Sequence, residues 1–399
     1  MRVQHLSLTN FRLYARLEVD LPAGSLILTG ANAQGKTSLL EALYYLATGQ
    51  SHHAASDRQL INFLALNEPQ PFAKIVAEVV PARRLEIRIL QEPTNFGDGR
   101  LRKEVLVNGV KKRVGDLAGL VQVVLFLPQD LALIEGAPSD RRRYLDTALC
   151  QVDPAYYFAL AEYGKVLSQR NALLKLLQEQ GGSDTQLDFW DEKLSEHGAL
   201  ILAGRAAALA DLESLAGAIH RDLTAGADSL RLAYHPAFDP AAAPEGQMGL
   251  PLNLPVHRTG IPPSEIQAGL KEKLRATRAE EVARGLTLSG PHRDEIRFLA
   301  NGVDLSTYGS RGQARTAVLA LKLAEVEWMR AKCGEWPILL LDEVLAELDA
   351  RRRRDLLSRL SGAEQCVMTT TDLNLFPPEF KERVTVWQVT AGQVRPANS

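Results

Sequence analysis

The sequence is poor in cysteine and in long apolar runs, and these absences exclude several classes of protein. Its three cysteines, Cys150, Cys333 and Cys366, lie far apart, so their spacing predicts neither a zinc site nor a disulfide framework. No run approaches the roughly 18 apolar residues that a membrane-spanning helix needs. The amino-terminal residues also lack an apolar segment of signal-peptide length. We therefore expect a cytoplasmic protein that does not span a membrane.

An excess of charge of one sign is also missing. The chain has 46 Lys and Arg residues against 48 Asp and Glu residues, for a formal net charge of -2. Such a chain has no global positive field, so any binding of nucleic acid would depend on a local basic patch. Its 399 residues, 46% of them hydrophobic, are enough for one large domain or two modest ones.

The apolar pattern separates an α/β part from a helical part. Residues 72–110 are typical of an antiparallel meander, with Asn108-Gly109 as a tight hairpin turn. Helical spacing dominates residues 140–223, with a reversal at 181–184 and a further helix expected over 264–284. The helix before that reversal, of about 27 residues, would span only about 40 Å, which is far too short for a long coiled coil.

A glycine-rich segment carries the strongest motif. Residues 30–37 read G-A-N-A-Q-G-K-T, which matches the P-loop pattern, and they stand between a buried strand and a helix as that pattern requires. Backbone N–H groups and the helix N-terminus would hold phosphate oxygens. Lys36 would reach the β- and γ-phosphates of ATP, and the Thr37 hydroxyl would bind Mg²⁺. The residues predicted to hold the nucleotide are Gly30, Ala31, Asn32, Ala33, Gln34, Gly35, Lys36, Thr37 and Ser38.

A second motif places two acidic residues at the end of a buried strand. Residues 338–341 are apolar, and Asp342 and Glu343 follow them. Ligands bind at the carboxyl ends of strands in open α/β sheets. Asp342 is predicted to hold Mg²⁺, directly or through water, and Glu343 to orient or deprotonate the attacking water. The second acid favours an ABC-type ATPase over a small GTPase or a kinase.

The third motif opens a long helix and resembles the ABC signature. Residues 310–313 read S-R-G-Q and precede an apolar stripe at helical spacing. In ABC ATPases such a helix start faces the γ-phosphate held by the other subunit, as the anion affinity of helix N-termini explains. Ser310 is therefore a candidate catalytic residue, and Gly312 and Gln313 are candidates for nucleotide contact. Asp349 resembles the D-loop aspartate at the dimer interface.

Two further positions are open to more than one interpretation. Thr371 lies where many ABC proteins have a catalytic histidine, and its hydroxyl can donate to a γ-phosphate but cannot carry a proton as histidine does. Alternatively it is an ordinary strand residue. Gln129, just after the apolar strand 120–127, is a candidate Q-loop residue that senses Mg²⁺ and the γ-phosphate, or a residue without such a role.

These motifs together resemble the RecF family of bacterial recombination mediators, which are related to SMC proteins, over essentially the whole chain. The stretches that carry the resemblance are residues 8–14, 37–44, 128–131, 136–138, 141–146, 289–294 and 308–313. Two features of the sequence depart from the family pattern. Ala33 replaces a usual glycine, and residues 50–53 read Gln-Ser-His-His, so no arginine is available at 50 or 53.

The resemblance implies an α/β fold with an ABC-type P-loop ATPase head, built from a mixed sheet plus an antiparallel β subdomain, and with an inserted α-helical lobe. We expect residues 1–135 and 285–399 to form the ATPase lobe and residues 136–284 the helical lobe. It implies that Arg12 contacts the bound nucleotide, with ATP and Mg²⁺ as cofactors. It further implies weak, DNA-stimulated ATP hydrolysis and a homodimer that forms on ATP.

The same resemblance implies partners. The dimer would bind gapped DNA or junctions of single- and double-stranded DNA, act with RecO and RecR, and help to load RecA, and slow hydrolysis would release the DNA. Two alternatives are an SMC-like structural ATPase and the nucleotide-binding subunit of a transporter. The first would need hundreds of heptad residues. The second would join its two Walker motifs over a much shorter stretch than the roughly 300 residues found here.

Four basic clusters are candidates for a DNA-binding patch, at residues 100–103, 111–113, 141–143 and 351–354. The first two flank the Asn108-Gly109 turn and are favoured, whereas the last alternatively serves its helix or the dimer. Because no aromatic residues interleave with them, we expect backbone binding with little sequence preference. The predicted DNA contacts are Arg100, Arg102, Lys103, Lys111, Lys112 and Arg113.

Overall fold

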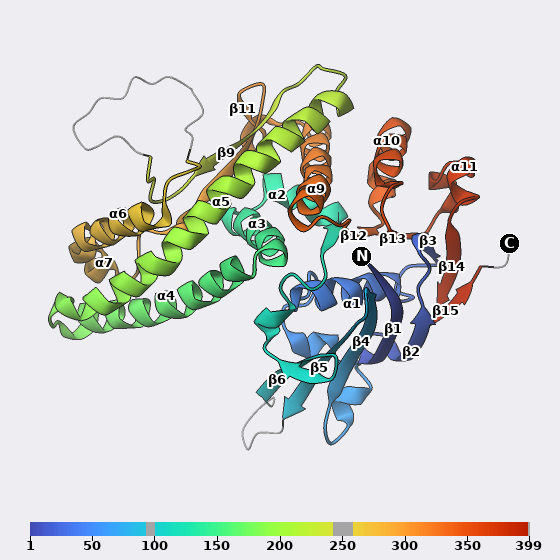
Figure 1. The fold of residues 1–399 in the computed structure, drawn as a ribbon, viewed down its shortest axis with the longest axis horizontal. Coiled ribbons are helices and arrows are strands. Elements are labelled where there is room, and N and C mark those ends of the chain that lie inside the picture. Colours follow the sequence, from blue (N-terminus) through green and yellow to red (C-terminus); the bar gives the residue numbers. More distant parts are fainter. Residues whose placement is uncertain (93–99, 242–257, 398–399) are drawn as a thin grey trace. The chain divides into compact units, whose positions relative to one another are not determined.

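The computed structural model describes residues 1–92, 100–241 and 258–397, and the chain divides into two compact units (Figure 1). The first unit comprises Met1–Asp130 and Met329–Ser399, and the second Leu131–Trp328. We expected the helical lobe to end near residue 284. The second unit extends further because strand β10 (Glu295–Ala300) pairs with β9 (Leu230–His235) of the same unit.

Two six-stranded sheets build the first unit. The antiparallel sheet has the order β2-β1-β4-β5-β6-β7, and the mixed sheet has the order β15-β14-β3-β13-β12-β8. The strands of the first are β1 (Arg2–Phe11), β2 (Tyr14–Asp20), β4 (Phe72–Val80), β5 (Arg83–Glu92), β6 (Arg100–Val107) and β7 (Val110–Lys112). Those of the second are β3 (Gly24–Thr29), β8 (Val123–Phe126), β12 (Ile338–Asp342), β13 (Gln365–Thr370), β14 (Thr385–Thr390) and β15 (Gln393–Pro396). The predicted combination of a mixed sheet with an antiparallel β subdomain is confirmed.

Helix α1 (Lys36–Thr48) connects the two sheets of the first unit. It contacts β12, β8 and β13 of the mixed sheet and β4 of the antiparallel sheet. Its Leu39 joins Leu26, Leu340, Leu8 and Ile75 in one continuous hydrophobic core. The helix begins where its first residues reach the carboxyl ends of the parallel strands, and this geometry places a P-loop helix at that edge. Two shorter helices, α10 (Ala350–Leu360) and α11 (Pro378–Lys381), complete the unit.

The Asn108-Gly109 turn forms as the sequence predicts. Both residues have positive φ angles, 51° and 79°, and Val107 pairs with Val110 across the turn. Positive φ at both central residues gives a two-residue turn the twist of the flanking strands, which explains why Asn-Gly is favoured there.

The second unit is mainly helical and includes a small sheet of order β11-β10-β9, completed by β11 (Val303–Asp304). Its helices are α2 (Ala132–Glu135), α3 (Pro138–Val152), α4 (Pro154–Gln180), α5 (Asp188–Leu223), α6 (Pro263–Ala276), α7 (Arg278–Arg284), α8 (Leu305–Tyr308) and α9 (Arg311–Cys333), of which the last helix continues past Trp328 into the first unit. Helix α4 has 27 residues, and the chain reverses its direction after the helix ends, from Gly181 onward, as expected. The prediction of a single helix over 264–284 is wrong, because the helix is interrupted at Thr277, which separates α6 from α7.

A network of buried charged side chains connects several helices of the second unit. The Arg170 side chain is fully buried and forms ion pairs with Asp191 and Glu281, and it donates to the Thr287 hydroxyl. Since a buried charge is tolerated only when paired and hydrogen-bonded, this network links α4 and α5 to α7 and to the segment that follows it.

Candidate nucleotide site

The P-loop follows β3 and requires glycine at two positions. Gly30 has φ of 150°, and a Cβ atom there would lie 2.3 Å from the carbonyl oxygen of Val389. Gly35 has φ of 114°, and a Cβ atom there would approach the Tyr14 hydroxyl to 3.0 Å. Glycine has no Cβ atom and tolerates these φ angles, so the loop can take this conformation. Its backbone N–H groups can then surround phosphate oxygens.

Contacts from distant segments brace this loop. The Tyr14 hydroxyl donates to the Gly35 carbonyl at 2.9 Å. The N–H groups of Ala391 and Gly392 donate to the Gln34 side-chain oxygen at 2.7 Å and to its carbonyl at 3.1 Å. The Gln34 side chain is therefore bonded to the turn between β14 and β15, and the backbone N–H of Gln34, a residue predicted to hold the nucleotide, remains for the phosphate cradle.

Lys36 lies across the loop and faces the second acidic residue of the Walker B motif. Its ammonium donates to the carbonyls of Gly30 and Ala31 at 2.8 and 3.0 Å. It also lies 3.3 Å from a carboxylate oxygen of Glu343. With only 4% of the residue exposed, this charge is stabilised by these contacts. A γ-phosphate would offer the ammonium a stronger anionic partner at the same place.

Thr37 and Asp342 meet as the sequence predicts for a magnesium site. The Thr37 hydroxyl lies 3.0 Å from both carboxylate oxygens of Asp342. Asp342 ends β12 and is buried. Mg²⁺ prefers oxygen ligands and is usually held by one or two carboxylates, a hydroxyl and substrate phosphates. These side chains therefore fit the ion chemically.

Glu343 adopts an unusual backbone conformation beside this pair. Its φ of 54° is left-handed, which is uncommon outside glycine and is frequent at functional sites. One carboxylate oxygen accepts from the backbone N–H of Thr371 at 3.3 Å. The other, which faces Lys36, is buried and accepts no hydrogen bond from any residue in the described ranges. A carboxylate oxygen with free lone pairs can accept a proton from water.

Thr369 is a site residue that the sequence reasoning missed. Its hydroxyl donates to Asp342 at 2.6 Å and accepts from the backbone N–H of Glu343 at 3.0 Å. By contrast, the predicted Thr371 approaches Glu343 only through its backbone N–H, and its residue is exposed. Strands β12 and β13 pair in parallel with Thr369 opposite Asp342, and this register places Thr369, not Thr371, at the carboxylate. The choice between the two threonines could have been inferred only from the strand pairing.

Replacing Thr369 with valine is expected to reduce ATP hydrolysis about tenfold while leaving the fold intact. Valine keeps the shape of the side chain but removes a donor to a buried carboxylate and an acceptor for the Glu343 N–H, so both acids lose their orientation. Steady-state phosphate release measures the effect, with Thr371→Val as the matched control. An equal loss in both variants would contradict the assignment to Thr369.

Gln129 emerges at the same edge of the mixed sheet. It follows β8, which pairs with β12 so that Phe126 lies beside Leu341. Gln129 is exposed, and its side chain makes no hydrogen bond to another described residue. This leaves its amide available to a ligand at that edge.

In the second unit, the signature segment caps its own helix. Ser310 accepts from the backbone N–H of Gln313 at 3.2 Å, and the Gln313 side chain accepts from the N–H of Ser310 at 3.1 Å. Ser310 and Gly312 are exposed at the start of the 23-residue helix α9. Reciprocal capping leaves the other amide groups of the first turn available for an anion. In the first unit, Asp349 similarly caps α10 by accepting from the N–H of Arg352.

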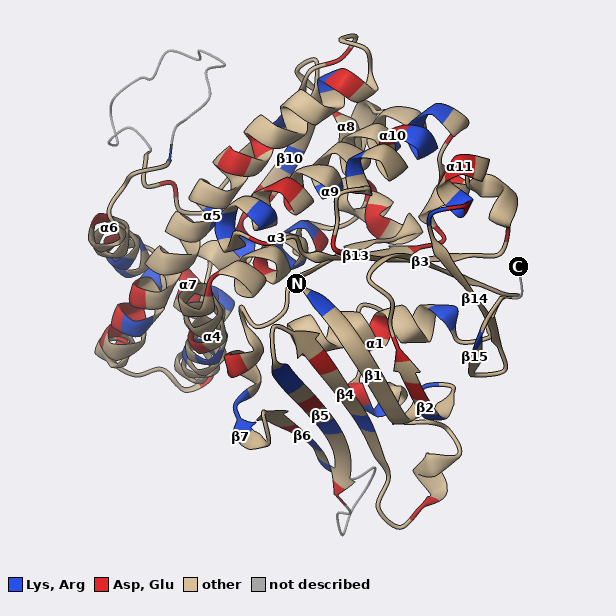
Figure 2. Cartoon of the chain, turned by 45° about the vertical axis from the view of Figure 1, so that its right-hand side comes forward, with Lys and Arg blue, Asp and Glu red and all other residues tan. Residues whose placement is uncertain are grey.

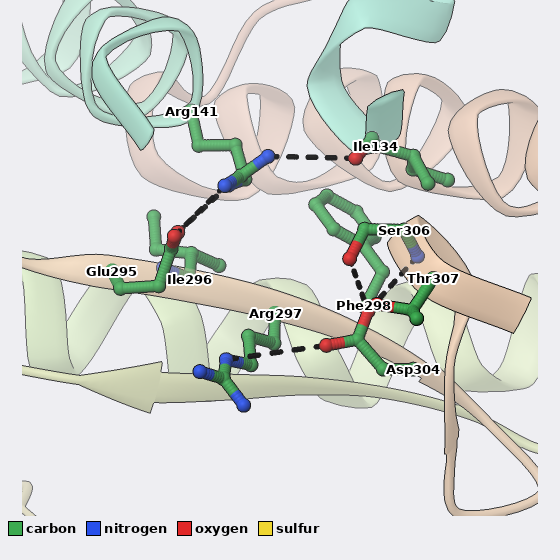
Figure 3. Close-up of a pocket in the computed structure, with 9 residues that line it drawn as sticks. All are labelled: Ile134, Arg141, Glu295, Ile296, Arg297, Phe298, Asp304, Ser306 and Thr307. Carbon is green, nitrogen blue, oxygen red and sulfur yellow. Dashed lines mark hydrogen bonds and ion pairs between the residues drawn. The ribbon is translucent and has the colours of Figure 1, made fainter. Parts of the chain in front are cut away.

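A separate pocket of about 210 Å³ lies within the second unit (Figure 3). Arg141 forms an ion pair with Glu295 across its wall, and Arg297 lies 3.9 Å from Asp304. Its charged lining residues therefore pair with one another within the second unit.

The predicted DNA cluster is partly neutralised by acids (Figure 2). Arg102 pairs with Glu92 and Glu104, and Lys111 pairs with Glu104. Lys103 turns inward, where it pairs with Asp57 and lies over the Tyr45 ring. The three remaining cluster residues are exposed and have no ion pair with another residue that the structure describes: Arg100, Lys112 and Arg113.

None of the described helices is long and apolar enough to cross a membrane. Residues 2–392 match the family model of the RecF/RecN/SMC N-terminal domain. The chain is 40% identical over 410 residues to the DNA replication and repair protein RecF of Chloroflexus aurantiacus, with 99% of each chain covered.

Two solved structures resemble the chain. One is the recombination mediator protein RecF with ATP in the RecFOR pathway, which is 30% identical, covers 99% of this chain and 97% of its own, and has a TM-score of 0.83. The other is an Smc head domain of Pyrococcus furiosus, which is 15% identical with a TM-score of 0.50, covers 99% of this chain and 95% of its own, and shares the fold.

Proposed function

The chain belongs to the RecF family of DNA replication and repair proteins, SMC-related ATPases of the ABC type, and we propose that it is an ATP-dependent recombination mediator. The observation that carries this proposal is the convergence of Lys36, Thr37, Asp342 and Glu343 at one edge of the mixed sheet. We place the protein in the cytoplasm, with RecO and RecR as its partners in loading RecA.

In the proposed reaction, the P-loop amides and Lys36 hold the β- and γ-phosphates, and Thr37 and Asp342 hold Mg²⁺. When bound, Mg²⁺ neutralises phosphate charge. Glu343 takes a proton from water, whose oxygen bonds to the γ-phosphorus while the bond to the β–γ bridging oxygen breaks. Thr369 and the N–H of Thr371 hold the two acidic residues in place for this step.

The proposed ATP-bound form is a homodimer, because Ser310 and Gly312 present an exposed helix start suited to the γ-phosphate of a second copy. ATP would shift the population toward the dimer by binding it better than the monomer. Sedimentation with ATP, with ADP and without nucleotide tests this. Hydrolysis per molecule that does not change with protein concentration would contradict it.

The DNA contact is proposed for the exposed cations Arg100, Lys112 and Arg113. Alanine at Lys112 and Arg113 together is expected to weaken binding to gapped DNA uniformly across sequences and to lower the slope of log affinity against log salt by about 2. Gel shifts at several salt concentrations, with and without ATP, measure this. Arg16→Ala, at an exposed arginine of the same sheet, is the matched control, and an equal change in slope there would contradict the assignment.

A further inference from the structure

Arg12 is held in one orientation by a buried acid. Its Nε and one terminal nitrogen each donate to a different oxygen of Glu41, both at 2.7 Å, and the other terminal nitrogen donates to the Gln59 carbonyl at 3.0 Å. The Glu41 side chain is 2% exposed and that of Arg12 is 23% exposed. A paired carboxylate under a partly exposed guanidinium fixes the plane of the cation while leaving one edge accessible.

The unused donors of Arg12 form a fork. A guanidinium has five N–H groups, and three of them are used by Glu41 and Gln59. The two that remain, one on each terminal nitrogen, bond to no other residue in the described parts of the chain. Two neighbouring N–H groups match the two oxygens of a phosphate group.

Glu41 is placed by the same helix that carries the P-loop lysine. It follows Thr37 by four residues in α1, so the two side chains share a face of the helix. Arg12, paired to Glu41, is therefore directed to the side of α1 that carries the predicted magnesium ligand.

Ser51 connects Glu41 to the loop after α1. Its hydroxyl donates to Glu41 and accepts from the backbone N–H groups of His53 and Ala54 at 2.9 and 2.7 Å. Burial would raise the pKa of Glu41, but the hydrogen bonds from Arg12 and Ser51 outweigh burial and hold that pKa below its ordinary value. The carboxylate therefore stays charged and keeps its hold on Arg12.

His52 adds no competing cation to this loop. Burial, followed by the neighbouring His53, lowers the pKa of His52 to about 4. Both ring nitrogens are buried and have no hydrogen-bond partner among the described residues. His52 is therefore neutral at physiological pH, and Arg12 carries the positive charge beside Glu41.

We propose that Glu41 is a positioning residue, supported by Ser51, that presents the free edge of Arg12 to a phosphate of the nucleotide bound in the P-loop. This inference rests on the proposed nucleotide site. The same hydrogen bonds would change the conformation of residues 51–54 when nucleotide binds, because any movement of Arg12 toward a phosphate acts on Ser51 through Glu41.

The test measures the dissociation constant for a fluorescent ATP analogue, in Mg²⁺, for the full chain. Glu41→Gln is expected to weaken binding about tenfold, because an amide has one acceptor oxygen and cannot accept both N–H groups that Arg12 donates to Glu41. Ser51→Ala is expected to act in the same direction by a smaller factor. In the double variant Arg12→Ala/Glu41→Gln, affinity should equal that of Arg12→Ala alone, since Glu41 acts through Arg12. Glu18→Gln, which alters an exposed Arg–Glu pair on β2, is the control and should leave affinity unchanged.

The outcomes separate the inference from its premise. If Arg12→Ala weakens binding but Glu41→Gln and Ser51→Ala do not, Glu41 has only a structural role and the inference is overturned. Effects of Arg12 and Glu41 that simply add would overturn it as well. If Arg12→Ala itself leaves affinity unchanged, the inference fails at its premise, while Lys36→Ala still tests the P-loop. If Glu41→Gln does not fold, Ser51→Ala and its double variant with Arg12→Ala decide the matter in the same way.

Discussion

ATP hydrolysis by the Glu343→Gln variant is expected to be about 10³-fold slower than by the native chain, with ATP binding retained. One carboxylate oxygen of Glu343 accepts no hydrogen bond from a described residue and can take a proton, whereas glutamine has the same shape but cannot act as a base. The backbone N–H of Glu343 still donates to the Thr369 hydroxyl in the variant, because this hydrogen bond does not involve the Glu343 side chain. The fold should therefore remain. Phosphate release over many turnovers measures the rate.

The same variant should accumulate as an ATP-bound dimer, because the step that ends the bound state is blocked. Sedimentation at saturating ATP measures the dimer fraction, and Glu379→Gln, at an exposed acid of α11, is the control. A variant that hydrolyses at the normal rate would remove Glu343 from proton transfer. One that stays monomeric at saturating ATP would contradict the nucleotide-dependent dimer.

Lys36→Ala is expected to weaken ATP binding by about 100-fold. The substitution removes the nearly buried ammonium that would pair with the β- and γ-phosphates, and it leaves the carboxylate of Glu343 without its cation, so that this carboxylate would repel the phosphates. Truncating one member of such a group typically costs several kcal/mol of binding free energy. Calorimetric titration with ATP at fixed Mg²⁺ measures the loss.

Thermal unfolding without nucleotide establishes whether this variant is folded, and Lys165→Ala, an exposed lysine of α4 paired with Glu162, is the matched control. An unchanged dissociation constant in a folded Lys36→Ala protein would show that the phosphates are not held by this loop. The proposed function would then have to be abandoned together with the site.

Much of the site follows from local sequence. Residues 30–35 form the loop between β3 and α1, Lys36 and Thr37 begin α1, and Asp342 and Glu343 stand at the end of β12, as predicted. The Asn108-Gly109 hairpin and the length of α4 were also predicted, because turn and helix preferences depend on the conformations of a few neighbouring residues.

Contacts between distant residues were not predictable in the same way. Arg12 and Glu41 lie 29 residues apart, and Gln34 and Ala391 lie 357 apart. Lys103 was expected to contact DNA, but its side chain turns inward and forms an ion pair with Asp57. A charge run in a sequence does not show which of its members will find a carboxylate in the fold.

The sequence by itself determined the family, the P-loop, the two acidic residues of the Walker B motif and the start of the signature helix, because each depends on residues a few positions apart. Only the tertiary structure decided that Thr369 and not Thr371 contacts Asp342, that Glu41 holds Arg12, and that the second unit extends to Trp328. Strand register and the burial of charged side chains set these features, and both arise when segments far apart in the chain pack together.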